Sequence, residues 1–293
     1  MNNPKHQQNL TFYKMHSLGN HFMVLDLISQ ACELSTEQIA QWGNPHTGIG
    51  FDQLLTIEPP TDPDMDFNYG IYNADGSRAE QCGNGTRAVT LLAHKLGLTH
   101  KNTLRWQSPA GQIQTHFEDA NSIETIMTTP ELDLEQIPFA ADHGHLLEHA
   151  SGFRQFALAG ADDTFTVTPI SMGNPHGVII VDDLFSMDVD SIGKSLTAHP
   201  AFPAKANISF CQIVDPQFIR LRVFERGVGE TQACGSGACA AVVAMRSLEL
   251  VEERVKVSLP GGKLRIKWSA AGTPVTMIGS AAFVYQGQLG SQL

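Results

Sequence analysis

The sequence has no apolar run long enough to cross a membrane as a helix. Its longest uninterrupted apolar stretch is residues 238–245, whereas a membrane-spanning helix needs about 20 such residues. Residues 1–8 are too polar to form the apolar part of a secretion signal. We therefore expect a cytoplasmic protein with no membrane partner.

Basic residues are scarce relative to acidic ones. The chain has 19 Lys and Arg against 30 Asp and Glu, which gives a formal net charge of -11. Such a surface repels phosphate backbones on average, so nucleic acid is not an expected partner. With 42% hydrophobic and 17% charged residues over 293 positions, the composition fits a globular protein of two domains.

Cysteine is also sparse, and its pattern excludes common structural uses. The five cysteines are an odd number and include no Cys-x-x-Cys pair, which argues against a disulfide framework or a zinc ribbon. Reduced thiols are the expected state. Cys32, Cys211 and Cys239 lack any special sequence context, so we expect them to pack in the core or along helices.

Cofactor motifs are absent as well. Neither glycine-rich loop has the spacing of a dinucleotide or phosphate-binding motif, and no lysine motif typical of pyridoxal enzymes is recognisable. His143, His145 and His149 have spacing that resembles a metal site, but they lie in an acidic connecting segment, where solvated side chains are the favoured reading. We expect no cofactor and no metal.

The chain contains one sequence pattern twice. Cys82 lies in Asn-Ala-Asp-Gly-Ser-Arg-Ala-Glu-Gln-Cys-Gly-Asn-Gly, and Cys234 lies in Glu-Arg-Gly-Val-Gly-Glu-Thr-Gln-Ala-Cys-Gly-Ser-Gly, 152 positions later (234 − 82). Leu-Gly-Asn20 recurs as Met-Gly-Asn174 after 154 positions (174 − 20). A repeat of this length predicts two similar domains.

Each half of the chain reads as strand, loop and helix around its cysteine. Extended apolar runs at 66–72 and 218–224 precede the loops, and helical runs at 86–96 and 238–245 follow them. Both helical runs carry small and apolar residues on every face, so they must be enclosed. Further strands are expected at 11–15, 22–28, 54–57, 104–107, 113–117, 165–167, 178–181, 208–214, 255–259, 264–268 and 281–285.

These segments predict an α/β (α+β) fold of two pseudo-symmetric domains, each a β-barrel-like sheet wrapped around a central apolar helix. The first domain is expected to comprise residues 1–128 plus 278–293 and to carry Cys82. The second is expected to comprise residues 129–277 and to carry Cys234. The boundary falls in the polar, proline-containing stretch at 128–138.

The position of the two cysteines suggests acid/base chemistry. A thiol at the start of a helix meets unpaired backbone N–H groups and the positive end of the helix dipole, which favour thiolate. The neighbouring glycines let backbone N–H groups converge on an anion such as a carboxylate. A thiolate on one side of a carbon and a thiol on the other can remove and return a proton with inversion.

Simpler explanations exist for these residues taken singly. One cysteine alone is most simply a buried structural thiol, and only the duplicated context favours function for Cys82 and Cys234. His176 is most simply a solvated or backbone-bonded loop residue. Glu225 and Arg226 read as an exposed pair at a strand end, but their place beside a glycine loop favours a role in the site.

Taken together, the two cysteine motifs, Met-Gly-Asn-Pro-His at 172–176 and Lys14-Met-His resemble the diaminopimelate epimerase family over nearly the whole chain, to Tyr285. The resemblance implies an isomerase, often a homodimer, that converts LL-diaminopimelate to the meso form. The implied route needs no pyridoxal phosphate, and it serves lysine and peptidoglycan precursor biosynthesis. The implied partner is the small-molecule substrate.

The resemblance also implies residue roles. Cys82 and Cys234 would be the two acid/base residues, and His176 and Glu225 would tune the pKa of the thiols. The implied substrate-binding residues are Asn20, Gln53, Asn73, Gly83, Asn84, Asn174, Asn207, Glu225, Arg226, Gly235 and Ser236. The repeat supports one pair independently, because Gln53 and Asn207 are also 154 positions apart (207 − 53).

The chain departs from the family pattern at three loop positions. Ser17 and His21 stand where the family usually has Gly and Asp, and Pro45 stands where Arg is expected. These positions lie near the pocket-forming loops, so they bear on substrate choice more than on the reaction type.

Three other functions stay open at this stage. A racemase of another amino acid, such as histidine or proline, would keep the mechanism and change the pocket. A cysteine hydrolase would use one thiol with a histidine and leave the other thiol dispensable. A ligand-binding protein would bind an amino acid without exchanging its protons with solvent.

Overall fold

The computed structural model describes residues 10–79, 82–109, 111–160 and 163–290. The chain forms two compact units, residues 1–125 with 280–293 and residues 126–279. Each unit has its own hydrophobic core. Among the described helices, none is long and apolar enough to cross a membrane.

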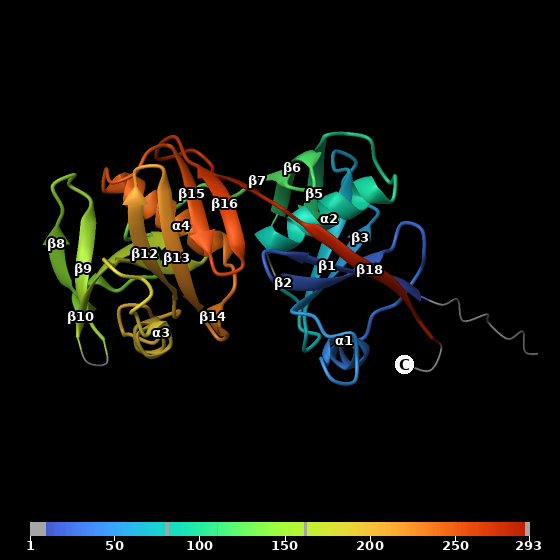
Figure 1. Cartoon of the computed structure of the whole chain (residues 1–293), viewed down its shortest axis with the longest axis horizontal. Coiled ribbons are helices and arrows are strands. Elements are labelled where there is room, and N and C mark those ends of the chain that lie inside the picture. The colour runs from blue at the N-terminus through green and yellow to red at the C-terminus, as the bar shows by residue number, and fades with distance from the viewer. Residues whose placement is uncertain (1–9, 80–81, 110, 161–162, 291–293) are drawn as a thin grey trace, which may run out of the picture. The chain divides into compact units, whose positions relative to one another are not determined.

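The first unit is a sheet that surrounds one helix (Figure 1). Helix α2 (Gly83–Lys95) packs against β1, β2, β3, β6 and β18. The short helix α1 (Thr36–Gly43) packs against β3 and covers a second apolar cluster. The strands are β1 (Leu10–Ser17), β2 (Asn20–Asp26), β3 (Gln53–Glu58), β4 (Phe67–Asn73), β5 (Thr103–Ser108), β6 (Gly111–Asp119), β7 (Ser122–Ile126) and β18 (Ala282–Leu289).

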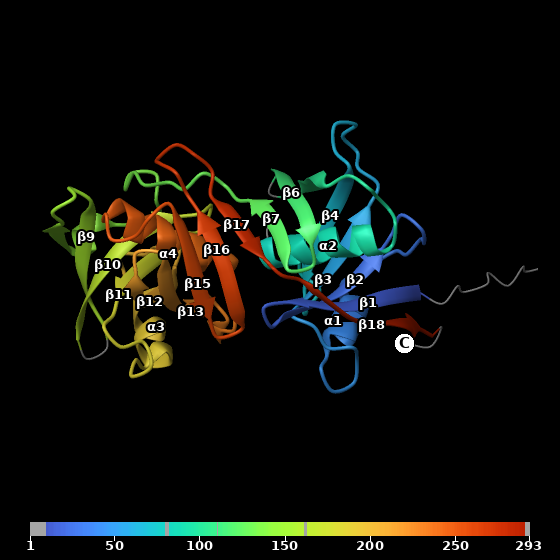
Figure 2. The same cartoon turned by 45° about the horizontal axis from the view of Figure 1, so that its top comes forward.

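The second unit repeats this arrangement around helix α4 (Gly235–Ser247), which packs against β10, β11, β12, β13 and β16 (Figure 2). Helix α3 (Val189–Thr197) covers β12 and β13 from the other side. A short 3-10 helix spans Ala141–His143. The strands are β8 (His145–Glu148), β9 (Arg154–Ala159), β10 (Thr164–Ser171), β11 (Pro175–Ile180), β12 (Asn207–Asp215), β13 (Phe218–Glu225), β14 (Gly229–Thr231), β15 (Arg254–Leu259), β16 (Gly262–Lys267) and β17 (Thr276–Gly279).

The strand pairings of the two units follow the same order. In the first unit, β1–β2 is antiparallel, β2–β3 parallel, β3–β4 antiparallel, β4–β5 parallel and β5–β6 antiparallel. In the second, β10–β11, β11–β12, β12–β13, β13–β15 and β15–β16 give the same sequence of directions. The internal repeat of the sequence is therefore a repeat of topology, and the predicted α/β fold with two similar halves is confirmed.

The two central helices are enclosed because almost every side chain on them is apolar or small. Residues Ala238 to Met245 of α4 are fully buried. Helix α2 differs from the sequence-based description, because Arg87 lies in its second turn and is 0% exposed. Each helix begins three residues earlier than the apolar pattern suggests, since the glycine-rich first turn carries no apolar periodicity and the preceding cysteine is the N-cap.

Candidate active site

Cys82 is the N-cap residue of α2. Its backbone is extended, with φ -148 and ψ 99, and its Sγ accepts a hydrogen bond from the backbone N–H of Gly85 at 3.2 Å. The side chain is partly exposed. A sulfur that accepts an N–H bond at the positive end of a helix is stabilised as thiolate. Cys82 thus has the surroundings of a base.

A neutral amide, that of Asn20, lies beside this thiol within the first unit. Asn20 Oδ1 lies 3.8 Å from Cys82 Sγ and 3.5 Å from Asn84 Nδ2. On the neighbouring strands β3 and β4, Gln53 Nε2 donates to Asn73 Oδ1 at 3.4 Å. The structure thereby brings Asn20, Cys82 and Asn84 together, and it pairs Gln53 with Asn73 in register.

Tyr69 supports the first turn of α2 from below. Its hydroxyl donates to the carbonyl oxygen of Cys82 at 3.2 Å, and the side chain is 0% exposed. A Cβ at Gly85 would collide with this hydroxyl and lie 3.3 Å from the Cys82 sulfur. Gly85 is therefore required because the helix approaches Tyr69 closely.

Cys234 occupies the corresponding N-cap of α4 in the second unit but is much more buried, at 4% exposure. Its Sγ lies 3.6 Å from Ser236 Oγ. Burial raises the pKa of Cys234 well above its usual range, and the charge of Glu225 raises it further, while hydrogen bonds from Ser236 and from the backbone N–H of Gly237 lower it only in part. Cys234 therefore rests as a protonated thiol, which is a proton donor.

Glu225 is the last residue of β13, and Arg226 follows it in the turn. Glu225 Oε1 accepts a hydrogen bond from Thr231 Oγ1 at 2.5 Å. The backbone N–H of Arg226 donates to Asn207 Oδ1 at 2.8 Å, and its Nη1 donates to the carbonyl of Ala204 at 2.8 Å. Arg226 is exposed, so its guanidinium keeps donors available for an anionic ligand.

His176 is completely buried beside Asn174, contrary to the solvated loop residue that its sequence context suggests. The ring Nε2 lies 3.1 Å from Asn174 Oδ1. Burial, with the charge of Arg226 as a smaller cause, lowers the pKa of His176 to about 3. The ring is therefore neutral near pH 7, and it influences the site by hydrogen bonding and packing rather than by charge.

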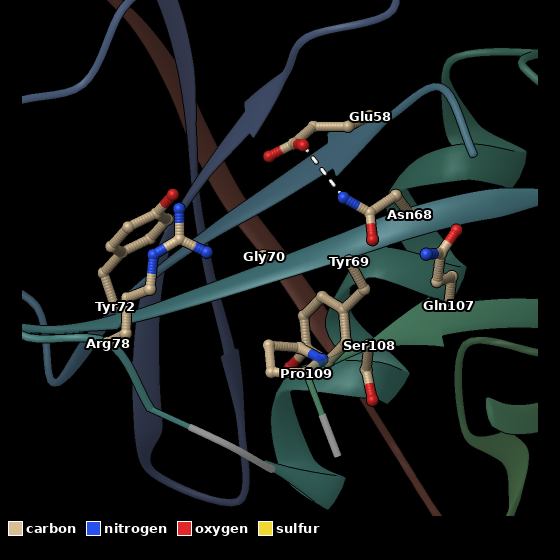
Figure 3. Close-up of a pocket in the computed structure, with 9 residues that line it drawn as sticks. All are labelled: Glu58, Asn68, Tyr69, Gly70, Tyr72, Arg78, Gln107, Ser108 and Pro109. Atoms are coloured by element: carbon tan, nitrogen blue, oxygen red, sulfur yellow. Dashed lines mark hydrogen bonds between the residues drawn. The ribbon is translucent and has the colours of Figure 1, made fainter. Parts of the chain in front are cut away.

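A separate pocket of about 250 Å³ opens on the first unit (Figure 3). Figure 3 shows Glu58 bonded to Asn68 and the guanidinium of Arg78 facing Tyr72. Tyr69 connects this pocket to Cys82 through its hydroxyl. None of the residues that the sequence assigns to the site lines this pocket, so the thiols and their amides define the candidate site instead.

The helix starts of the two units favour one kind of ligand group, an anion. The first-turn N–H groups of α2 and α4 can receive a carboxylate. Within the described residues, His, Cys, Asp and Glu side chains form no group of three or more that could hold a metal ion.

Three residues around the site were missed from the sequence. Tyr69 and Arg87 contact the first turn of α2, and Asp52 bonds to the side chain of Asn20. A signal existed for Arg87, because an arginine in an otherwise apolar helix must find buried partners. Asp52 and Tyr69 belong to separate segments whose proximity only the folded sheet reveals.

Comparison with known proteins places the chain among characterised sequences and folds. The family model described as Diaminopimelate epimerase matches residues 12–132 and 168–284. The diaminopimelate epimerase of Ectopseudomonas mendocina (strain ymp) is 45% identical over 280 residues, which cover 96% of this chain and 99% of that protein. The diaminopimelate epimerase of Pseudomonas syringae pv. tomato (strain ATCC BAA-871 / DC3000) has the same identity and coverage.

Solved structures show the same fold at low identity. A hydroxyproline epimerase from Agrobacterium vitis, with bound trans-4-OH-L-proline, matches with a TM-score of 0.69 at 12% identity, over 97% of this chain and 93% of that one. A predicted epimerase from Pseudomonas aeruginosa matches with a TM-score of 0.66 at 14% identity, over 96% and 99%.

Proposed function

Because this chain belongs to the diaminopimelate epimerase family, we propose that Cys82 and Cys234 are the acid and base with which it epimerises diaminopimelate. The reaction inverts one of two equivalent stereocentres and converts the LL form to the meso form. It is an isomerisation without pyridoxal phosphate, and it belongs to lysine and peptidoglycan precursor biosynthesis.

The observation that carries the proposal is the duplicated helix start. Both thiols are N-cap residues of 13-residue helices buried in the centre of their units. One thiol has surroundings that favour thiolate, and the other has surroundings that favour the protonated form. Inversion by proton transfer needs one group of each kind.

The proposed steps balance as follows. The thiolate takes the Cα proton, so the C–H bond breaks and an S–H bond forms, leaving a carbanion next to the carboxylate. The opposite thiol then gives its proton to the other face of the carbon, so its S–H bond breaks and a new C–H bond forms. The charge has moved from one sulfur to the other, and reaction in the opposite direction uses them with reversed roles.

Electrostatic stabilisation of the carbanion must supply much of the rate. Positioned proton transfer contributes about 10²–10⁴ in rate, so preorganised dipoles have to lower the rest of the barrier for so weak a carbon acid. The backbone of Gly83 and Asn84 on α2, and of Gly235 and Ser236 on α4, supplies N–H groups where the reacting carboxylate gathers charge.

The remaining site residues fit the two ends of a diamino diacid. Arg226 is proposed to bind the distal carboxylate, since its exposed guanidinium can bond in a bidentate manner. Burial and, as a smaller cause, the charge of Glu225 raise the pKa of Cys234, and Glu225 is also proposed to offer its carboxylate to an ammonium group. The amides proposed to orient the substrate are those of Asn20, Gln53, Asn73, Asn174 and Asn207, and His176 positions Asn174.

The enzyme is further proposed to act as a cytoplasmic homodimer. Val284 and Tyr285 on β18 are 52% and 45% exposed, so each offers a single apolar side chain to a partner chain. The cytoplasmic location is proposed from the sequence, because an odd set of five cysteines without a Cys-x-x-Cys pair is typical of reduced thiols in a reducing compartment.

The two-thiol scheme is tested by epimerisation in deuterated water. The wild-type enzyme should place solvent deuterium at Cα of the product, and Cys82→Ala and Cys234→Ala should each lose interconversion by at least about a thousandfold. Cys32→Ala, which removes a thiol outside both helix starts, should keep wild-type rates. Full epimerisation by either site variant would refute the scheme.

A further inference from the structure

An ordered chain of hydrogen bonds runs beside the Cys82 sulfur. Arg87 Nη2 donates to Asn84 Oδ1 at 2.6 Å, and Asn84 Nδ2 donates to Asn20 Oδ1 at 3.5 Å. Asn20 Nδ2 then donates to Asp52 Oδ2 at 2.9 Å. Asn20 Oδ1, in the middle of this chain, is the atom that lies 3.8 Å from Cys82 Sγ.

The two ends of the chain dictate its direction. A guanidinium can only donate hydrogen bonds, and a carboxylate can only accept them. Arg87 therefore fixes which way the Asn84 amide faces, and Asp52 fixes the Asn20 amide. Asn20 therefore directs its side-chain oxygen, and not its nitrogen, toward the Cys82 sulfur. This orientation follows from which groups in the chain can donate and which can accept a hydrogen bond.

Both ends are held in place by further contacts. Arg87 is 0% exposed and also donates to Ser17 Oγ at 2.8 Å, while Ser17 Oγ donates to the carbonyl of Ser280 at 2.7 Å. Asp52 accepts the backbone N–H of His21 at 2.9 Å and donates its own N–H to the carbonyl of His21 at 2.9 Å. Two titratable groups face this carboxylate: His21 Nε2 lies 3.5 Å from Asp52 Oδ1, and Lys14 Nζ lies 3.2 Å from the other ring nitrogen of His21. The chain thus spans fixed points on α2 and on the loop before β3.

The direction matters for the charge state of Cys82. An amide oxygen beside the sulfur can accept a hydrogen bond from S–H, which stabilises the thiol, whereas the N–H of Gly85 stabilises the thiolate. Tyr69 does not compete for charge, because burial raises its pKa well above the usual range and keeps it neutral. A group that alternates between acid and base needs both stabilising contacts.

We propose that Asp52 is a positioning residue that, together with Arg87, holds the Asn20 oxygen against the Cys82 sulfur so that the protonated state of Cys82 stays accessible during turnover. The inference rests on the proposed acid/base role of Cys82. Asp52 acts as a hydrogen-bond acceptor for Asn20 and not through its negative charge.

The test follows the alkylation of Cys82 by iodoacetamide as a function of pH. Trypsin cuts after Arg78 and Arg87, and Cys82 is the only cysteine of that peptide, so mass spectrometry reports this thiol alone. Asp52→Ala removes the acceptor and should lower the midpoint pH by about one unit, a tenfold change in the thiol–thiolate equilibrium. In the pH profile of epimerase kcat/KM, the limb that reports the ionisation of Cys82 should move by the same amount.

Conservative variants separate an acceptor role from a charge effect. Asp52→Asn keeps an acceptor oxygen without the charge and should stay within about 0.3 units of wild type. In an Asn20→Ala background, Asp52→Ala should add no shift, because the residue through which Asp52 acts is gone. Asp64→Ala removes an exposed carboxylate of the same unit and should leave the midpoint unchanged.

Three results would overturn the proposal. These are an unshifted Asp52→Ala variant, equal shifts in Asp52→Asn and Asp52→Ala, or a shift that persists without the Asn20 side chain. Failure of the underlying function looks different, since an active Cys82→Ala enzyme would refute the acid/base role whatever the alkylation profiles show. Asp52 is half-exposed, so its variants should fold, and circular dichroism checks that they do.

Discussion

The two units have the same strand order but differ in the side chains at matching positions. Asn20 and Asn174 match, and the residue two positions later is Phe22 in one unit and His176 in the other. In the parallel ladders, Phe22 pairs with Gln53 and His176 pairs with Asn207. The two units therefore have amide side chains at matching positions, but the residues next to those amides differ.

The largest difference is charge. Asn73 of the first unit and Glu225 of the second are 152 positions apart (225 − 73), as the two cysteines are. The first thiol lies 3.8 Å from the neutral Asn20 amide and is partly exposed, whereas burial and, as a smaller cause, the carboxylate of Glu225 raise the pKa of the second. The same backbone design therefore places its two thiols in different surroundings.

Removing the guanidinium of the second unit should have the largest effect on substrate recognition. Arg226→Ala is expected to lower kcat/KM for diaminopimelate by about a hundredfold, because a lost charged pair costs about 2–5 kcal/mol. Asn73→Ala in the first unit should cost only about tenfold, as expected for a neutral hydrogen bond. Steady-state assays with both stereoisomers measure the two ratios.

The control for Arg226 is Arg154→Ala, which removes an exposed cation on β9 of the same unit. It should leave kcat/KM unchanged. Equal losses for Arg226→Ala and Asn73→Ala would show that the two units share substrate binding evenly, contrary to the comparison above.

Exchanging the buried residue beside the amides should change acid stability. His176 is buried with a pKa of about 3, while an unfolded histidine has its ordinary value of 6.5. Below pH 6.5 His176 binds a proton in the unfolded chain but stays neutral in the folded chain. The free energy of unfolding therefore falls as pH falls toward 3. At pH 5 this cost is about 2 kcal/mol.

His176→Phe copies the first unit, in which Phe22 is 0% exposed. Urea titrations at pH 7 and pH 5 should show a smaller acid-induced loss of stability in the variant than in wild type. A His149→Phe variant alters a histidine that is only partly buried and should keep the wild-type difference between the two pH values. An undiminished acid loss in His176→Phe would mean that other groups cause it.

Much of the fold was predictable because burial leaves a clear pattern in the sequence. The predicted strand at 54–57 lies inside β3, and the predicted 218–224 differs from β13 by one residue. Helices α1 and α3 were missed because they are short and mostly polar outside one narrow face. A signal for α1 did exist, since Ser35 and Gln38 form a capping box.

The candidate site was predictable only as far as its motifs reach. The two cysteines and their glycines stand in contiguous repeated segments, so one sequence reveals them. The Asp52 contact with Asn20 joins residues 32 positions apart, and Arg87 meets Ser17 across 70. Such contacts depend on strand register and on the depth of the helix, which no local pattern encodes.

Removing the carboxylate beside Cys234 should bring the two thiols closer in reactivity. Glu225 raises the pKa of Cys234, so Glu225→Gln should lower it, and alkylation should begin at a lower pH. We expect a rate gain of about tenfold at pH 8. Isotope-coded iodoacetamide and mass spectrometry follow the cysteines of the 227–246 tryptic peptide.

Glu148→Gln provides the matched control, since this carboxylate is exposed on β8 of the same unit. Its peptide profile should match wild type. Cys82 should remain the faster thiol in every one of these proteins, because it is more exposed and accepts the Gly85 N–H bond. Faster labelling of Cys234 than of Cys82 in the wild type would reverse the assignment of resting acid and base.

The smallest expected effect concerns the ends of the two central helices. Gly97 follows α2 with φ 70, and Glu249 follows α4 with φ 61, 152 positions later (249 − 97). Both close the helix in the left-handed conformation, which costs a residue with a side chain about 1–2 kcal/mol and glycine almost nothing. Glu249→Gly should therefore raise the free energy of unfolding by about 1 kcal/mol, and Gly97→Glu should lower it by a similar amount.

A Cβ at Gly97 would meet no atom within 4 Å, so the loss would arise from backbone conformation alone. Thermal unfolding of both variants decides the point, and stabilisation by Gly97→Glu would show that side-chain contacts outweigh the backbone preference at this cap.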